Sequence, residues 1–166
     1  MKNLLILGAG QYSAIAYELA KASGIFRKID FLDDFAPKAI GKISDAPTLI
    51  KDYNCAIVAM GCTTNRMKYL KELEEAGYEI PVLQSSMAYV SESACVGGGT
   101  IIEPMAVIHS NVKIGKGCLI CAGAVVNHDA IVEDGCQINC NAVVPSSHTV
   151  PKKTKLACGC VFSSDK

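Results

Sequence analysis

The sequence has no net charge, no block of like charge and only a short apolar run at its N-terminus. Its 166 residues carry 16 Lys and Arg against 16 Asp and Glu, so the formal net charge is zero. No block of like charge occurs, which argues against a nucleic-acid-binding or an anionic-membrane-binding surface. The apolar run at the N-terminus, residues 4–7, ends at Gly8 and is too short for a signal peptide or a membrane span. We therefore expect a cytoplasmic protein with neither a nucleic-acid nor a membrane partner.

The sequence does have an aliphatic residue at every sixth position over its second half. The series is Val90, Val96, Ile102, Ile108, Ile114, Ile120, Val126, Val132, Ile138, Val144, Val150 and Leu156. The fifth position of each six-residue repeat holds a small residue except at His148. The fourth position is rich in Gly, Asn and Asp, the types that adopt positive φ most easily. Short strands with left-turning corners are typical of a triangular parallel β-helix. Three sixes make one 18-residue coil, so residues 85–166 are predicted to form a left-handed β-helix of four coils.

Residues 1–84 follow a different pattern, in which apolar runs alternate with amphipathic stretches. This alternation predicts a Rossmann-like α/β domain with a parallel sheet. We expect strands over 3–7, 28–32, 56–60 and 80–83, helices over 12–22 and 65–76, and a short helix within 41–53.

A glycine turn after the first expected strand indicates a nucleotide site. Gly8 and Gly10 occupy the first two positions of a GxGxxG motif, whereas the third position is Ser13. Asp33 follows at a distance suited to a ribose hydroxyl or a base edge. About 85 residues supply only one half of a dinucleotide fold, so a mononucleotide or nucleotide-sugar is favoured over NAD. The alternative is that Gly8 and Gly10 only let the helix pack close to the strand.

Nine cysteines in a chain without an export signal are expected to stay reduced. Cys118 and Cys121 form a CxxC pair, and Cys158 and Cys160 a CxC pair, so a zinc or redox site is an alternative. The repeat favours a structural role instead, because three cysteines fall in the inward small column as compact apolar fillers: Cys118, Cys136 and Cys160.

The chain has three histidines, His109, His128 and His148, which the repeat places on one face of successive coils. His128 is followed directly by Asp129, and an imidazole oriented by a carboxylate can act as a general base. The alternative is a surface histidine at a corner. A three-histidine zinc site of a metal hydratase is a further alternative, although the histidines are 19 and 20 residues apart here and β-helical carbonic anhydrases place two of their ligands five apart.

The combination of these features resembles the bacterial sialic acid O-acetyltransferase and UDP-4-amino-sugar N-acetyltransferase family. The resemblance covers nearly the whole chain. It rests on the glycine turn 8–10, the segment 31–35, the strand end 59–61 and the repeat around residues 125–129.

The resemblance implies a homotrimer with acetyl-CoA, the donor substrate, bound between neighbouring β-helices and with no metal. His128 would accept a proton from the acceptor amine or hydroxyl, Asp129 would orient it, and a backbone amide would stabilise the oxyanion. Gln137 and Ser146 would face the acetyl-CoA thioester arm. The nucleotide-sugar site would be lined by Gly8, Gly10, Tyr12, Asp33, Asp34 and Gly61.

The sequence thus predicts an acetyl-CoA-dependent acetyltransferase that acts on an amino or hydroxyl group of a sugar, either a UDP-amino sugar or a sialic acid. One alternative is a non-catalytic nucleotide-sugar-binding or scaffold subunit with a shortened C-terminus. Another is an acyltransferase with a longer acyl group. The acceptor, the choice between N- and O-transfer and the acyl chain length stay open at this point.

Overall fold

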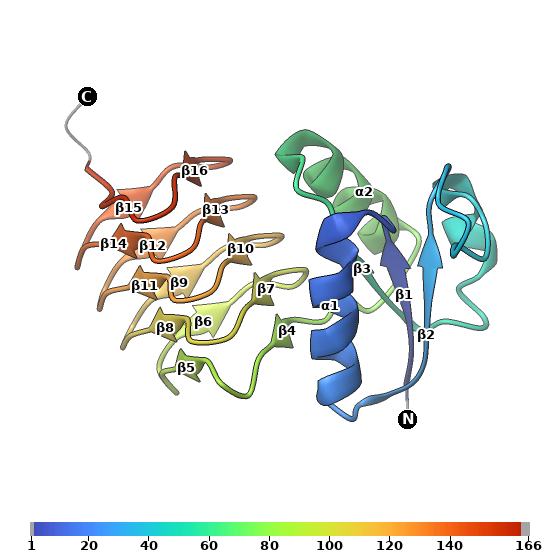
Figure 1. The fold of residues 1–166 in the computed structure, drawn as a ribbon, viewed down its shortest axis with the longest axis horizontal. Helices are drawn as coiled ribbons and strands as arrows, with labels where there is room; N and C mark the ends of the chain where they lie inside the picture. The colour runs from blue at the N-terminus through green and yellow to red at the C-terminus, as the bar shows by residue number, and fades with distance from the viewer. Residues whose placement is uncertain (1, 164–166) are drawn as a thin grey trace. The chain divides into compact units, whose positions relative to one another are not determined.

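The computed structural model describes residues 2–163, and the contacts within the chain divide it into two compact units, residues 1–83 and 84–166. The first unit is an α/β fold, as predicted (Figure 1). Its elements in chain order are β1 (Lys2–Leu7), α1 (Gln11–Ala22), β2 (Phe26–Leu32), the 3-10 helix η1 (Ile43–Thr48), β3 (Cys55–Val58) and α2 (Thr63–Glu75).

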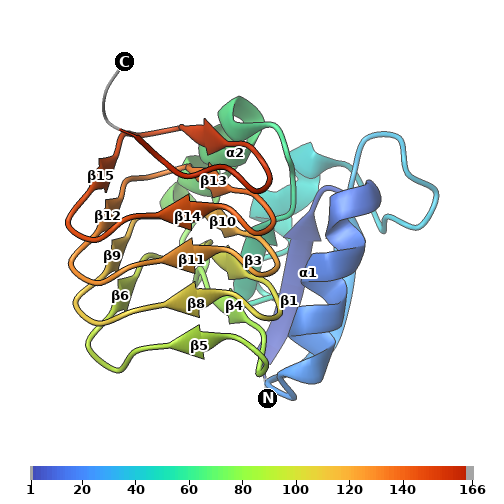
Figure 2. The same cartoon turned by 60° about the vertical axis from the view of Figure 1, so that its left-hand side comes forward.

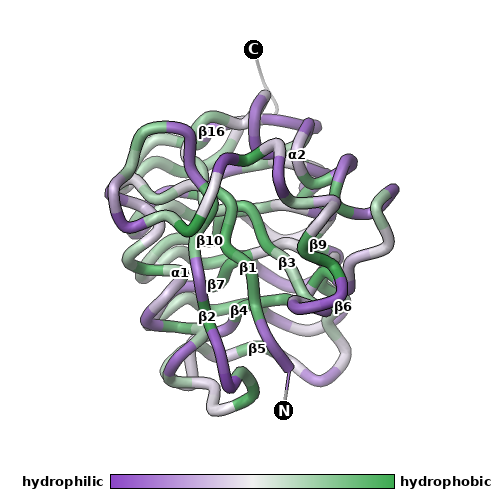
Figure 3. Tube along the Cα trace, turned by 90° about the vertical axis from the view of Figure 1, so that its right-hand side faces the viewer, coloured by the Kyte–Doolittle hydropathy of each residue, from purple (hydrophilic) through white to green (hydrophobic). Residues whose placement is uncertain are grey.

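The three strands of this unit form a parallel sheet in the order β2-β1-β3. The central strand β1 is hydrophobic along most of its length, whereas the edge strand β2 carries polar residues at its second, third and fifth positions (Figure 3). Residues 4–7 of β1 and all of β3 are buried, as expected where helices cover both faces of a parallel sheet. Leu5, Leu70 and Leu73 belong to the hydrophobic core between the sheet and α2.

Two expected strands differ from the structure. The third strand ends at Val58, so Ala59 and Met60 lie in the loop that follows it. The strand expected over 80–83 is wrong: Glu79 makes only an isolated bridge to Cys55, and residues 80–82 are not in a strand. Pro81 lacks the N–H that a strand would use there.

The second unit is a left-handed parallel β-helix, as predicted (Figure 2). Its strands are two residues long: β4 (Leu83–Gln84), β5 (Tyr89–Val90), β6 (Cys95–Val96), β7 (Ile101–Ile102), β8 (Val107–Ile108), β9 (Lys113–Ile114), β10 (Leu119–Ile120), β11 (Val125–Val126), β12 (Ile131–Val132), β13 (Gln137–Ile138), β14 (Val143–Val144), β15 (Thr149–Val150) and β16 (Lys155–Leu156). They stack into three sheets, β16-β13-β10-β7-β4, β14-β11-β8-β5 and β15-β12-β9-β6. β5 to β16 make the four expected coils.

Residues 18 apart pair across neighbouring coils, for example Val126 with Ile108 and with Val144. The second residue of each strand points inward, and from Ile102 to Val150 this aliphatic column is buried. The hydrophobic effect therefore fixes the register, because a shift by one residue would expose the whole column.

The corners adopt the left-handed backbone conformation that the repeat predicted. Every fourth place of the repeat from Gly99 to Gly159 has φ between 57° and 76°. This set includes Met105, Ser147 and Lys153, residue types that rarely adopt positive φ. The stacked coils thus impose the corner even where the residue does not favour it. Within residues 2–163, no helix combines the length and the apolar composition that crossing a bilayer requires.

Candidate functional site

A pocket of about 400 Å³ lies in the first unit, where its three parallel strands end. The carboxyl edge of a parallel sheet is the usual place for a ligand in such folds, because loops from several strands meet there. The loops after β1, β2 and β3 line the pocket together with the first turns of α1 and α2. The lining residues are Gly8, Gly10, Gln11, Tyr12, Asp33, Asp34, Phe35, Ile43, Ala59, Met60, Gly61, Cys62, Asn65 and Tyr69. All six residues expected to bind the nucleotide-sugar are among them.

The two glycines of the turn have different reasons to be glycine. Gly8 has a φ of +96°, and a Cβ there would lie 3.0 Å from Met60 Cγ and 3.1 Å from the Ala59 carbonyl oxygen. Gly10 has a φ of −76°, and a Cβ there would meet nothing within 4 Å. Close packing thus explains Gly8 but not Gly10, which borders the pocket. Ser13, at the third position of the motif, is fully buried and its hydroxyl donates to the Gly10 carbonyl at 2.6 Å.

Asp33 organises the pocket wall through backbone hydrogen bonds. Its Oδ2 accepts from the Ala9 N–H at 2.8 Å, and its Oδ1 accepts from Phe35 and Ala36 N–H groups at 2.9 Å each. These donors, that of Ala9 foremost, hold the pKa of the Asp33 carboxyl below its ordinary value. Asp34 Oδ1 accepts from the Ile43 N–H at 3.2 Å. Asp33 therefore ties the glycine turn to the 33–43 loop and Asp34 joins the two ends of that loop, while both carboxylates retain acceptor capacity on the pocket side.

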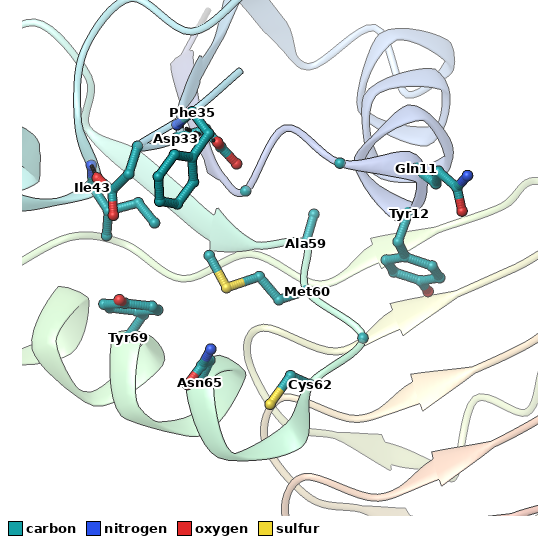
Figure 4. A pocket seen from close by; sticks show the side chains of 14 residues that line it. Gln11, Tyr12, Asp33, Phe35, Ile43, Ala59, Met60, Cys62, Asn65 and Tyr69 are labelled. Carbon is teal, nitrogen blue, oxygen red and sulfur yellow. Dashed lines mark hydrogen bonds between the residues drawn. The ribbon is translucent and has the colours of Figure 1, made fainter.

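The lining residues that were not expected from the sequence include three large or polar side chains: Phe35, Asn65 and Tyr69. Figure 4 shows Phe35 on one side of Met60 and Tyr69 on the other, with Asn65 one helical turn before Tyr69. The Phe35 side chain is 94% exposed, which is unusual for a large apolar residue. The sequence could have indicated Asn65 and Tyr69, because residues i and i+4 share a helix face and α2 begins at the same sheet edge.

Arg66 is a buried cation behind this pocket that the sequence analysis also missed. It is 0% exposed, and its Nη1 donates to the carbonyl oxygens of Met60 at 2.8 Å and Gly61 at 3.3 Å. These bonds satisfy carbonyls of the loop between β3 and α2. Arg66 therefore holds that loop in the conformation that forms the pocket wall.

The second unit places the three histidines in successive corners between two of its sheets. His109 follows β8, His128 follows β11 and His148 follows β14. His109 packs edge-on against Tyr89, and His148 Nδ1 lies 2.9 Å from the Ser146 carbonyl oxygen. Among the described residues, His128 is the one histidine whose ring nitrogen lies within hydrogen-bond distance of a carboxylate.

His128 Nδ1 lies 2.8 Å from Asp129 Oδ2, and both side chains are at least half exposed. The pKa of the Asp129 carboxyl is lowered, first by its hydrogen bond with His128 and then by one from Asn111. When Nδ1 donates its proton to Asp129, Nε2 presents a lone pair to solvent. This arrangement can accept a proton from a bound nucleophile.

The two residues expected to contact acetyl-CoA lie apart within one chain. Ser146 is in the corner after β14, one coil beyond His128. Gln137 is in β13, which belongs to the sheet β16-β13-β10-β7-β4, whereas the histidine corner joins the other two sheets. Gln137 Nε2 donates to Asn139 Oδ1 at 2.8 Å, and its Oε1 is buried without a hydrogen-bond partner among residues 2–163.

Two of the three cysteines expected as inward fillers are buried. Cys118 Sγ donates to the Glu133 carbonyl oxygen at 3.2 Å, and Cys136 Sγ to that of Pro151 at 3.1 Å. The neighbouring Cys136 thiol and burial raise the pKa of the Cys118 thiol. Cys160 is exposed, contrary to the expectation, and lies after β16, the last of the described strands. Within residues 2–163, no group of three or more His, Cys, Asp or Glu residues is arranged to hold a metal ion.

Two family profiles match the chain, one in each of its two units. Residues 3–73 match the family profile of the PglD N-terminal domain, and residues 93–128 match that of the bacterial transferase hexapeptide with six repeats. No curated protein sequence matches the chain.

Solved structures match over nearly the full length. The acetyltransferase domain of PglB from Neisseria gonorrhoeae FA1090, in complex with acetyl coenzyme A, has a TM-score of 0.92 and 26% identity, over 96% of this chain and 81% of that chain. A variant of perosamine N-acetyltransferase from Caulobacter crescentus, in complex with CoA and GDP-perosamine, has a TM-score of 0.87 and 20% identity, over 99% and 90% of the two chains. WeeI from Acinetobacter baumannii AYE has a TM-score of 0.72 and 18% identity, over 97% and 88%.

The last two matches show a shared fold, and the match to PglB adds sequence similarity across both units. The two family profiles and the match to PglB support the sugar acetyltransferase family that the sequence resembles, because this chain has a PglD-type N-terminal domain followed by hexapeptide repeats.

Proposed function

We propose that the protein transfers an acetyl group from acetyl-CoA to an amino or hydroxyl group of a nucleotide-linked sugar, with His128 as the general base. The observation that carries the proposal is the 2.8 Å contact between His128 Nδ1 and Asp129 Oδ2 at an exposed β-helix corner. The similar acetyltransferase domain of PglB binds acetyl coenzyme A, which supports the same donor here.

In the proposed reaction the acceptor N–H or O–H gives its proton to His128 Nε2 as the nucleophile attacks the thioester carbonyl carbon. The oxygen of the tetrahedral intermediate accepts a hydrogen bond from a backbone N–H. The C–S bond then breaks, and the CoA thiolate recovers the proton from the imidazolium. Asp129 keeps the Nδ1 proton in place and stabilises the imidazolium.

We assign the nucleotide part of the acceptor to the pocket at the sheet edge of the first unit. Residues 1–84 would then be a nucleotide-sugar-binding domain and residues 85–166 the acetyltransferase domain. The Asp33 and Asp34 oxygens can accept from ribose hydroxyls or a base edge, and the N-terminus of α1 favours a phosphate. The exposed Phe35 ring offers an apolar face for a nucleobase, and stacking of this kind contributes about 1–3 kcal/mol.

A homotrimer completes the proposed donor site. Gln137 and His128 occupy different faces of one β-helix, so a cleft that contains both needs the Gln137 face of a second copy. The sheet β14-β11-β8-β5 supplies a contact surface for that copy, because the first residue of each strand points outward and is apolar: Tyr89, Val107, Val125 and Val143. An apolar sheet face next to a catalytic corner is suited to a subunit interface.

The first test is acetyl transfer from acetyl-CoA to a panel of UDP-amino sugars, UDP-sugars and sialic acids, read by mass spectrometry. We expect one acceptor class to gain an acetyl group and His128→Ala to lose at least 100-fold in kcat, within the range of a general base, about 10²–10⁴. His109→Ala, one coil earlier in the same corner, is the matched control and should keep its activity. Nucleotide binding without any transfer would instead favour a non-catalytic binding or scaffold subunit.

The nucleotide site is tested separately by calorimetry with the nucleoside diphosphate of the acceptor. Phe35→Ala should weaken binding by about tenfold, in line with the loss of one stacked ring. Ile40→Ala removes another exposed apolar side chain from the same loop and serves as the control. Equal affinities of the two variants would refute the stacking role of Phe35.

A further inference from the structure

Asn111 lies one coil before the His128–Asp129 pair and contacts it directly. Its Nδ2 donates to Asp129 Oδ1 at 3.0 Å, and Asp129 uses its other oxygen, Oδ2, for His128. Asn111 and Asp129 are 18 residues apart, so they occupy the same place in successive coils. Both have the left-handed corner conformation, with φ of 60°.

The backbone of Asn111 is itself held by the coil before it. Its N–H donates to Ser93 Oγ at 3.0 Å, and Ser93 is again 18 residues earlier. A row of stacked polar residues, Ser93, Asn111 and Asp129, therefore runs along the corner and ends at the imidazole of His128. Within this row Asn111 is the residue whose side chain fixes the rotation of the Asp129 carboxylate.

We propose, on the basis of the proposed function, that Asn111 is a positioning residue that orients Asp129 so that the His128 imidazole presents Nε2 to the acceptor. An exposed carboxylate held by a single partner can rotate about its side-chain bonds, whereas one with a donor on each oxygen has a defined plane. The neutral amide of Asn111 donates to the carboxylate without adding a charge. The imidazole is thereby held in one orientation before the acceptor binds.

The chemistry of the row explains why an amide suits position 111. An aspartate there would place a second carboxylate against Asp129, and like charges at this distance favour the imidazolium form of His128. A glycine would keep the positive φ of the corner and remove only the side chain. The other titratable side chains of these corners are Glu92, His109 and His148.

The test compares Asn111→Gly with Asn141→Gly. Asn141 has a φ of 57° and occupies the same place of the repeat in a corner that lacks a histidine, so the two variants remove the same side chain from the same backbone conformation. We expect Asn111→Gly to lower kcat by about three- to tenfold with unchanged KM for both substrates, as for the loss of one hydrogen bond. Asn141→Gly should leave kcat unchanged.

A double-mutant cycle separates positioning from a general structural effect. In an Asp129→Gly background, Asn111→Gly should change kcat by less than about 1.5-fold, since the side chain that accepts its hydrogen bond is already gone. An undiminished loss in that background would overturn the proposal, and so would an Asn111→Gly kcat equal to that of the unsubstituted protein.

A titration of the His128 ring by NMR, in the absence of substrate, tests the row independently of catalysis. Asn111→Asp should raise the pKa of His128, and the acidic limb of the pH profile of kcat/KM should move to higher pH with it. Asn141→Asp should leave both unchanged. If His128→Ala remained active, the proposed base would be wrong. An unchanged His128 titration in Asn111→Asp would instead refute the coupling of position 111 to His128 through Asp129.

Discussion

The two units of this protein build their candidate sites in opposite ways. In residues 1–83 the pocket collects loops that follow three different strands, and Asp33 reaches across to the Ala9 N–H to hold two of those loops together. In residues 84–166 a single repeat stacks every residue on the one 18 positions away, so that Asn111 meets Asp129 by register alone. In a repeat, the residues that lie side by side can therefore be predicted from the sequence. In an α/β fold, the residues that meet in a site depend on how separate loops come together.

The largest expected effect comes from breaking the register. Insertion of one alanine between Leu119 and Ile120 turns the following inward aliphatic residue outward. Each lost aliphatic burial costs about 1.5–3 kcal/mol, so displacement of a few exceeds the stability of an ordinary domain. We expect loss of the cooperative thermal transition of the β-helix, measured by circular dichroism.

The control for this insertion is one alanine between Pro37 and Lys38, in a loop of the first unit. Those residues lie between β2 and η1, outside any repeat, so a small change in melting temperature is expected. Equal losses from both insertions would show that the register of the repeat has no special role.

The next largest effect is the difference in stability lost when an inward or an outward isoleucine of the β-helix is truncated. Ile120 is fully buried and Ile131 is 38% exposed, although both lie in two-residue strands. Ile120→Ala should cost about 2–5 kcal/mol by lost burial and a residual cavity, and Ile131→Ala less than about 1 kcal/mol. Urea unfolding measures both, and a reversed order would contradict the inward assignment of the column.

A smaller effect separates the two glycines of the first unit. Gly8→Ala places a Cβ at positive φ and against the Ala59 carbonyl, so a loss of about 1–2 kcal/mol is expected. Gly10→Ala meets open space at ordinary φ and should change stability by less than about 0.5 kcal/mol. Thermal unfolding measures these differences, and nucleotide calorimetry shows whether Gly10→Ala obstructs the pocket.

The smallest expected effect is the pH dependence of the first unit. Three backbone N–H groups hold the pKa of Asp33 below its ordinary value of 3.8. The folded carboxylate is thus favoured, and its contribution is complete above pH 3.8 and is lost as the pH falls through the lower folded value. Asp33→Asn should flatten the fall in melting temperature between pH 5 and about 3, whereas Glu18→Gln, at an exposed helix position, should keep the fall of the unsubstituted protein.

More of the structure of the second unit than of the first could be predicted from the sequence. The inward column, the left-handed corners and the four coils follow from a repeat whose period is fixed, and the structure confirms them. In the first unit the strand over 80–83 was wrong, because a short apolar run beside Pro81 does not specify a strand. The six expected pocket residues do line one pocket, but Phe35, Asn65 and Tyr69 were missed because their neighbours lie far away in the sequence.

The sequence by itself determined the fold class, the place of the glycine turn, the placement of the three histidines on one face of successive coils and the pairing of His128 with Asp129. These features depend on short-range patterns, namely periods of six residues and adjacent positions. Only the tertiary structure decided that Asp33 holds the glycine turn, that Arg66 holds the loop behind the pocket and that the Asn111 amide, which the repeat places beside Asp129, donates to its carboxylate. Each of these is a directional hydrogen bond, and its partner is set by where the backbone passes in space rather than by the identity of the residue alone.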